Sequence, residues 1–121
     1  MAITTVGFTG AGNKISGATT VNDFDYLAIG DGNTAFAVGD TTLVSEITDS
    51  GLARIQVTPT QSGAVTTWTY EWTASGTKTI KEAGILNASS TGTLLARQVL
   101  GTERAVTSGN TYTLTATLTL S

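Results

Sequence analysis

Two acidic side chains have the spacing of a catalytic pair, because Asp23 and Asp25 flank Phe24. Residues i and i+2 of an extended segment share a face, and two carboxylates about 5–9 Å apart can hydrolyse a glycosidic bond. The neighbouring residues are typical of turns, however, which favours solvated loop aspartates. The chain also has no histidine and no cysteine, so it lacks the usual nucleophile–base pairs and the common zinc ligands. We therefore expect a protein that is not an enzyme, with no cofactor and no metal ion.

Two glycine-containing stretches match ligand-binding loops only in part. Gly10-Ala11-Gly12 begins like a dinucleotide-binding loop, but Ile15 stands where the third glycine belongs. Asp31-Gly32-Asn33 begins like a calcium loop, but Thr42 stands where the bidentate glutamate of an EF-hand is required. Both stretches are better explained as turns. A different calcium site remains open, with three candidate ligands: Asp31, Asp40 and Asp49.

Three aromatic residues alternate along one strong strand pattern, residues 65–73. Trp68, Tyr70 and Trp72 share a face, with threonines and Glu71 on the other. A row of core aromatic residues is the favoured interpretation. The alternative is an exposed aromatic platform that binds sugar or a partner subunit, since tryptophan and tyrosine suit both.

One acidic residue lies inside a strand-like run, Glu82 within residues 79–86. A carboxylate in such a position needs a specific hydrogen-bond or arginine partner. Arg97 and Arg54 are the candidates. We expect Glu82 to be a structural buried acid that fixes the register of the sheet, rather than a residue that acts on a substrate.

The elements that must position these residues are predicted to be strands. Threonine makes up about a fifth of the chain and favours strands. Residues 111–120 alternate throughout between threonine and apolar residues, and no long window has helical periodicity. The other strands are expected at residues 24–29, 42–47, 52–58, 65–73, 79–86 and 93–100. This spacing predicts an all-β fold, an antiparallel β-sandwich of about seven or eight strands, for which a jelly roll is one possible form.

The first 21 residues differ from the rest, because they are rich in glycine and contain few large apolar side chains. We expect them to form either an N-terminal arm that lies on another subunit or an edge strand, with residues 22–121 forming the sandwich domain. The arm would make its intersubunit contacts through its apolar residues: Ile3, Val6, Phe8 and Ile15.

Charge is scarce, since 12% of the residues are charged and the net charge is -3. The basic residues are scattered, so we expect no nucleic acid partner. No apolar run is long enough for a membrane span, and the N-terminus does not look like a signal peptide. We therefore expect no membrane partner, and the absence of cysteine fits maturation in a reducing cytoplasm. A weakly charged, threonine-rich surface favours a protein that packs side by side with others.

Three blocks of sequence resemble small virion proteins of tailed bacteriophages. They are residues 26–32 (YLAIGDG), residues 40–47 (DTTLVSEI) and residues 80–87 (IKEAGILN), followed by residues 92–97 and the threonine-rich final strand. The order and spacing of these blocks carry the resemblance, which covers residues 22–121.

The resemblance implies a non-enzymatic structural protein located in the virion, which is assembled in the host cytoplasm. A capsid decoration (auxiliary head) protein is the favoured form, binding and stabilising the outer capsid lattice; the alternative is a tail or head fibre module that recognises host-surface carbohydrate. The implied partners are the major capsid protein and the chain itself, as a homo-oligomer for which we expect a trimer.

Overall fold

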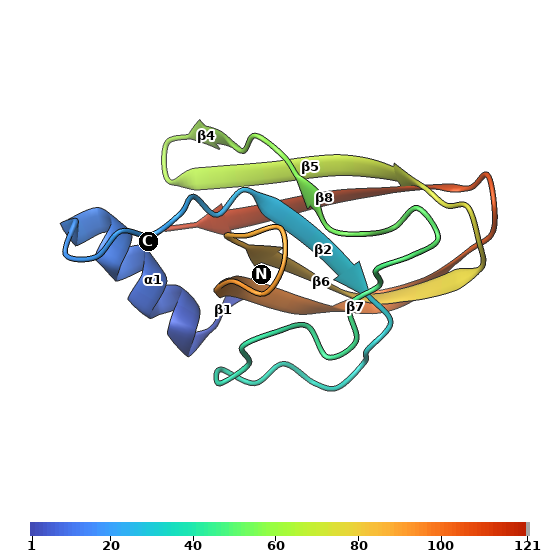
Figure 1. The fold of residues 1–121 in the computed structure, drawn as a ribbon, viewed down its shortest axis with the longest axis horizontal. Helices are drawn as coiled ribbons and strands as arrows, with labels where there is room; N and C mark the ends of the chain where they lie inside the picture. The colour runs from blue at the N-terminus through green and yellow to red at the C-terminus, as the bar shows by residue number, and fades with distance from the viewer. Residues whose placement is uncertain (121) are drawn as a thin grey trace.

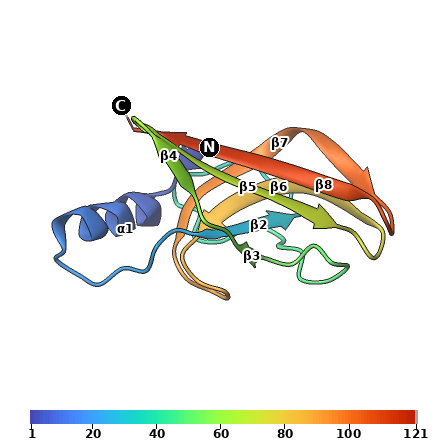
Figure 2. The ribbon, with the colours of Figure 1, turned by 90° about the horizontal axis from the view of Figure 1, so that it is seen from above.

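The computed structural model describes residues 1–120, which form two antiparallel sheets packed face to face (Figures 1 and 2). One sheet has the strand order β1-β7-β6-β2-β3 and the other β4-β5-β8. The elements in chain order are β1 (Ala2–Ile3), α1 (Thr5–Ser16), β2 (Tyr26–Gly30), β3 (Ile55–Gln56), β4 (Thr60–Ser62), β5 (Val65–Thr73), β6 (Lys78–Leu86), β7 (Leu94–Val106) and β8 (Thr111–Thr119). The predicted all-β sandwich is confirmed; the jelly-roll form stays a prediction.

The chain crosses from one sheet to the other at one end of the sandwich. The connections β5–β6 and β7–β8 both cross between the sheets there (right in Figure 1). Backbone hydrogen bonds join the two crossings, because Ala74 N–H donates to the Asn110 carbonyl (2.8 Å) and Gly109 N–H donates to the Ala74 carbonyl (2.7 Å). Gly109 has φ 90°, a conformation that glycine adopts without strain. This tie fixes how the two sheets overlap.

The core between the sheets is made by the alternation that the sequence predicts. Strands β5 and β8 pair over nine residues, from Val65 opposite Thr119 to Thr73 opposite Thr111. Along β8 and from Thr67 onward in β5, the apolar side chains point inward and the threonines point outward. The buried apolar side chains of the other sheet form the opposite wall of the core; they include Leu27, Ile29, Ile80, Ile85 and Val106.

The N-terminal segment contains an α-helix, so the predicted edge strand is wrong for residues 5–16, while the arm that lies on another subunit stays a prediction. Thr4 is the N-cap: its hydroxyl accepts from Gly7 N–H (2.9 Å) and donates to the Leu94 carbonyl (2.6 Å). Gly17 ends the helix in the left-handed conformation. Only Ala2 and Ile3 form an edge strand, paired with β7.

Two glycines of α1 explain why the glycine-rich composition of this segment did not indicate a helix. A Cβ on Gly7 would lie 2.2 Å from the Leu95 carbonyl oxygen, and one on Gly10 would lie 3.0 Å from the Phe24 ring. The glycines therefore bring the helix against β7 and the segment that leads into β2. They serve close packing and not disorder.

The strand predicted at residues 42–47 is also absent, apart from one bridge between Glu46 and Gly30. The N–H groups of Val44 and Ser45 donate to the side chain of Glu82 instead of to a neighbouring strand. Residues 31–51 consequently form a long irregular loop, held by the Glu82 side chain and by backbone bonds such as that from Asp31 N–H to the Ser45 carbonyl (2.9 Å); most of it lies below the sheets in Figure 1.

Candidate functional site

The centre of the largest buried polar network is Glu82, on β6, which is 0% exposed and accepts four hydrogen bonds. Its Oε1 accepts from Val44 N–H (2.9 Å) and from Arg97 Nε (2.8 Å), and its Oε2 accepts from Ser45 N–H (2.7 Å) and Gly32 N–H (3.0 Å). Each carboxylate oxygen thus has two donors. The buried negative charge is balanced by one guanidinium and three backbone dipoles.

Arg97, on β7, extends this network to the far part of the loop and is also 0% exposed. Its Nη1 donates to Asp40 Oδ2 (3.0 Å) and its Nη2 to the Thr34 carbonyl (2.8 Å). Asp40 Oδ2 also accepts from Ala37 N–H (3.1 Å). Of the two arginines named from the sequence, Arg97 is therefore the partner of Glu82, and the pair fastens residues 31–45 to the sheet.

Two glycines make room for the buried carboxylate. A Cβ on Gly32 would lie 2.5 Å from Glu82 Oε2 and 2.6 Å from the Cβ of Val44. A Cβ on Gly30 would lie 2.5 Å from the Ser45 carbonyl oxygen and 2.7 Å from Glu82 Oε2. The glycines of the YLAIGDG block are thus required by the position of Glu82, which lies 50 residues after Gly32 in the sequence.

The other candidate, Arg54, forms a second and separate pair. It binds Glu46 through two hydrogen bonds, from Nε (3.0 Å) and from Nη2 (2.6 Å). Its Nη1 donates to the carbonyls of Ala88 (2.8 Å) and Thr91 (2.9 Å). This arginine therefore links the end of the long loop to the turn after β6.

These two networks hold the long loop to the rest of the fold. All hydrogen-bonding positions of Glu82 are occupied, and no buried polar side-chain atom of residues 1–120 lacks a partner. The three sequence blocks and the segment at residues 92–97 meet here, through Gly30 and Gly32, Asp40 to Glu46, and Glu82 with Arg97. These four parts of the sequence therefore form one structural unit.

The aromatic row lies in the core, so an exposed platform is not present. Trp68 and Trp72 are each 3% exposed, and Tyr70 packs edge-on against Trp72 with ring centroids 5.0 Å apart. Each indole N–H has a backbone acceptor: Trp68 donates to the Phe24 carbonyl (2.6 Å) and Trp72 to the Ala53 carbonyl (2.9 Å). Both tryptophans are therefore satisfied core residues.

Four of the five aspartates singled out from the sequence have separate partners, Asp40 with Arg97 as described above. Asp23 pairs with Lys14 and Asp25 accepts from Gln56 Nε2 (2.7 Å), so each carboxylate is engaged on its own side. Lys78 binds Asp49 (3.0 Å) and holds the pKa of that carboxyl below its usual range. Within residues 1–120, no three acidic side chains gather as a metal site would require.

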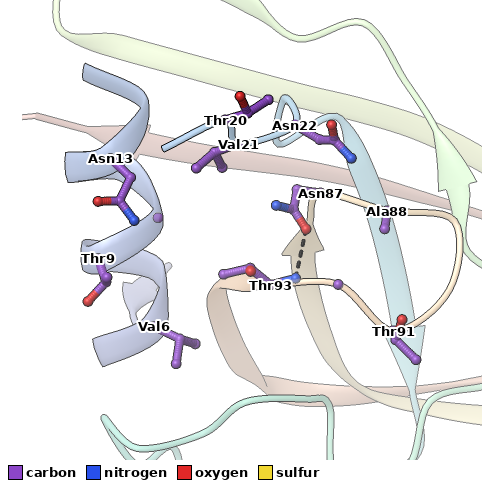
Figure 3. A pocket seen from close by; sticks show the side chains of 12 residues that line it. Val6, Thr9, Asn13, Thr20, Val21, Asn22, Asn87, Ala88, Thr91 and Thr93 are labelled. Atoms are coloured by element: carbon purple, nitrogen blue, oxygen red, sulfur yellow. Dashed lines mark hydrogen bonds between the residues drawn. The ribbon is translucent and has the colours of Figure 1, made fainter. Parts of the chain in front are cut away.

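A polar pocket of about 550 Å³ lies between α1 and the loop after β6 (Figure 3). Its walls carry neutral hydroxyl and amide groups, and Asn87, at its edge, is held by Thr93 N–H at 2.7 Å. The sequence did not indicate this pocket, because it depends on where α1 docks. The lining includes the polar residues labelled in Figure 3 as Thr9, Asn13, Thr20, Asn22 and Thr93.

The four apolar residues expected to make intersubunit contacts divide into two kinds. Ile3 packs against the core from β1, and Val6 lines the polar pocket. Phe8 and Ile15 lie on α1, 61% and 83% exposed. Ile15 borders an apolar groove of about 550 Å³ that runs from α1 to the final strand and ends beside Leu120.

Among residues 1–120, no helix is both long and apolar enough to span a membrane. Comparison of the chain with models of protein families, and with curated proteins, finds no match to either.

Proposed function

We propose that this chain is a non-enzymatic structural protein of a bacteriophage particle, and specifically a decoration protein that binds the outer capsid lattice. The observation that carries the proposal is the convergence of the resembling blocks. Residues from the three blocks and from the segment 92–97 meet around Glu82 and Arg97, so these four parts have a shared physical reason for their order and spacing. That supports a likeness of fold over a chance likeness of short motifs.

The mechanism requires no chemistry. A protein that binds only the mature lattice stabilises that lattice by mass action, by an amount set by its concentration and affinity. The exposed apolar side chains of α1 are the part of the surface best suited to such contact, because Phe8 and Ile15 gain cover only from another molecule.

The direct test is to purify particles of the bacteriophage that encodes the chain and locate the protein by cryo-electron microscopy. We expect regular density on the outside of the capsid. Absence of the chain from purified particles would refute the virion assignment, and density on the tail alone would refute decoration.

Binding to particles stripped of the protein then tests the surface. Deleting the N-terminal segment is unsuitable, because Thr4 is buried and Ile3 pairs in the sheet. The double variant Phe8→Ser, Ile15→Ser changes only exposed side chains and should weaken binding at least tenfold. The variant Val38→Ser, which alters another exposed apolar side chain, is the matched control.

A fibre module that recognises host-surface carbohydrate is the second candidate. It is favoured by the polar pocket beside α1, whose neutral amides and hydroxyls are the groups that bind sugars without charge. Titration with a panel of bacterial surface oligosaccharides tests it. Binding that is lost in Asn13→Leu and kept in Asn110→Ala would support the pocket, and no binding at millimolar sugar would refute it.

A further inference from the structure

Strand β8 is an edge strand whose outer side pairs with no other strand of residues 1–120. It lies at the end of the order β4-β5-β8, and β5 is the one strand that it pairs with. Leu120 N–H donates to the Ala64 carbonyl and the Asn110 carbonyl accepts from Ala74 N–H, so the even-numbered residues point their backbone groups toward β5. Backbone groups alternate along an antiparallel strand. The odd-numbered residues therefore point their N–H and C=O groups outward, away from β5.

All five of these outward-pointing residues are threonines, at positions 111, 113, 115, 117 and 119. Proteins usually protect an edge strand with a charged residue, a proline or a bulge. Residues 111–119 contain neither charge nor proline, and their nine pairs with β5 run without a register shift. The other long strand with an open side, β7, carries Glu103 and Arg104 on its outer part.

The β8 sequence is complementary to itself when two copies run antiparallel. With the two-fold axis at Thr115, every outer-face threonine lies opposite a threonine of the other copy. On the inner face the same register sets Tyr112 opposite Leu118 and Leu114 opposite Ala116, so each larger side chain meets a smaller one. Tyr112 and Leu118 are half-buried in the single chain and would be covered by this pairing.

We propose that two copies of this chain pair through their β8 edges to form a two-fold dimer with one continuous six-stranded sheet. The five outward-pointing residues of each copy supply about ten backbone hydrogen bonds across the seam. The occupant is a second copy because an isologous contact needs a self-complementary surface, which β8 has. The proposal is independent of any role in a virion.

The N-terminus of the chain lies at the outer edge of β8. The ammonium group of Met1 donates to the Thr117 carbonyl, with a long distance of 3.4 Å. This contact confirms that Thr117 points its carbonyl outward. In the dimer, the Thr113 N–H of the second copy takes its place.

Sedimentation equilibrium over a range from 1 µM to 1 mM tests the proposal. We expect the untagged chain to reach twice its 12.4 kDa mass. Thr115→Lys puts two lysines opposite each other at the seam and should weaken dimerisation at least tenfold, with recovery in high salt. Thr69→Lys is the matched control, because Thr69 pairs with Thr115 on the same exposed face but one strand away from the edge.

Two further variants keep the test decisive. Thr115→Pro removes an outward N–H without touching the bonds to β5, so it should give a folded monomer with unchanged tryptophan fluorescence. The chain has no cysteine, so Thr115→Cys alone should be joined into dimers by a short bismaleimide, whereas Thr69→Cys should not. A monomer at 1 mM, a trimer, or equal dimerisation of the two lysine variants would overturn the proposal.

Discussion

The replacement of Glu82 by glutamine tests the central structural conclusion with a change of one atom. Each oxygen of the carboxylate accepts two hydrogen bonds. The amide nitrogen of glutamine must take the place of one oxygen, so it faces two N–H donors whichever way it is turned. The variant loses two acceptor contacts and leaves Arg97 with only the partly exposed Asp40 as a counter-charge.

The expected loss follows from these contacts. An unsatisfied buried donor costs about 1–3 kcal/mol, and removal of one partner from a buried ion pair costs about 3–5 kcal/mol. We expect Glu82→Gln to lower the free energy of unfolding by about 3–5 kcal/mol. That is a large part of the roughly 5–15 kcal/mol of a typical domain, and it corresponds to a fall in Tm of about 10–20 °C.

Urea and thermal unfolding followed by tryptophan fluorescence provide the assay, because both indoles are buried in the core. Glu71→Gln is the matched control: Glu71 is exposed on β5 and accepts one hydrogen bond, from Thr113 Oγ1 (3.1 Å), so its loss should stay within about 0.5 kcal/mol. A loss below about 1 kcal/mol in Glu82→Gln would refute the view that this carboxylate holds the long loop to the sheet.

Three further predictions concern the helix, a tyrosine and the core. Gly7→Ala should displace α1 and lower the free energy of unfolding in urea by about 2 kcal/mol or more, because the new Cβ has no space. Gly12→Ala, whose Cβ would have nothing within 4 Å, should stabilise the helix by about 0.5–1 kcal/mol. Equal effects of the two variants would contradict the close packing of α1. Burial raises the pKa of the Tyr112 phenol above 10.0, against an opposing effect of Arg104, so the folded state holds this proton more tightly than the unfolded state. The resulting stability is complete below about pH 10 and is lost as the pH rises through the folded pKa; Tyr112→Phe should flatten that part of the stability curve, and an unchanged curve would count against it. Finally, acrylamide should quench the fluorescence of Trp68 and Trp72 only weakly in the native protein, and quenching as strong as in urea would contradict their burial.

The sequence by itself determined the class of fold and the longest strands. Residues 65–73 were predicted with the bounds that β5 has, and residues 111–120 differ from β8 by one residue. Alternation of this length is a local signal, because the period of side chains along a strand is two whatever surrounds it. It also identified Glu82 as an acid in need of a partner, with Arg97 as one of two choices.

Only the tertiary structure decided which polar group acts where. The helix α1 was missed because its glycines lower helix propensity, while the contact with β7 that requires them is visible only in three dimensions. Residues 42–47 have the pattern of a strand, yet the N–H groups of Val44 and Ser45 bind the carboxylate of Glu82, which is 38 and 37 residues away respectively. The pocket beside α1 depends on packing, and the outward direction of the backbone N–H and C=O groups of the β8 threonines depends on strand pairing. The order of residues alone specifies neither.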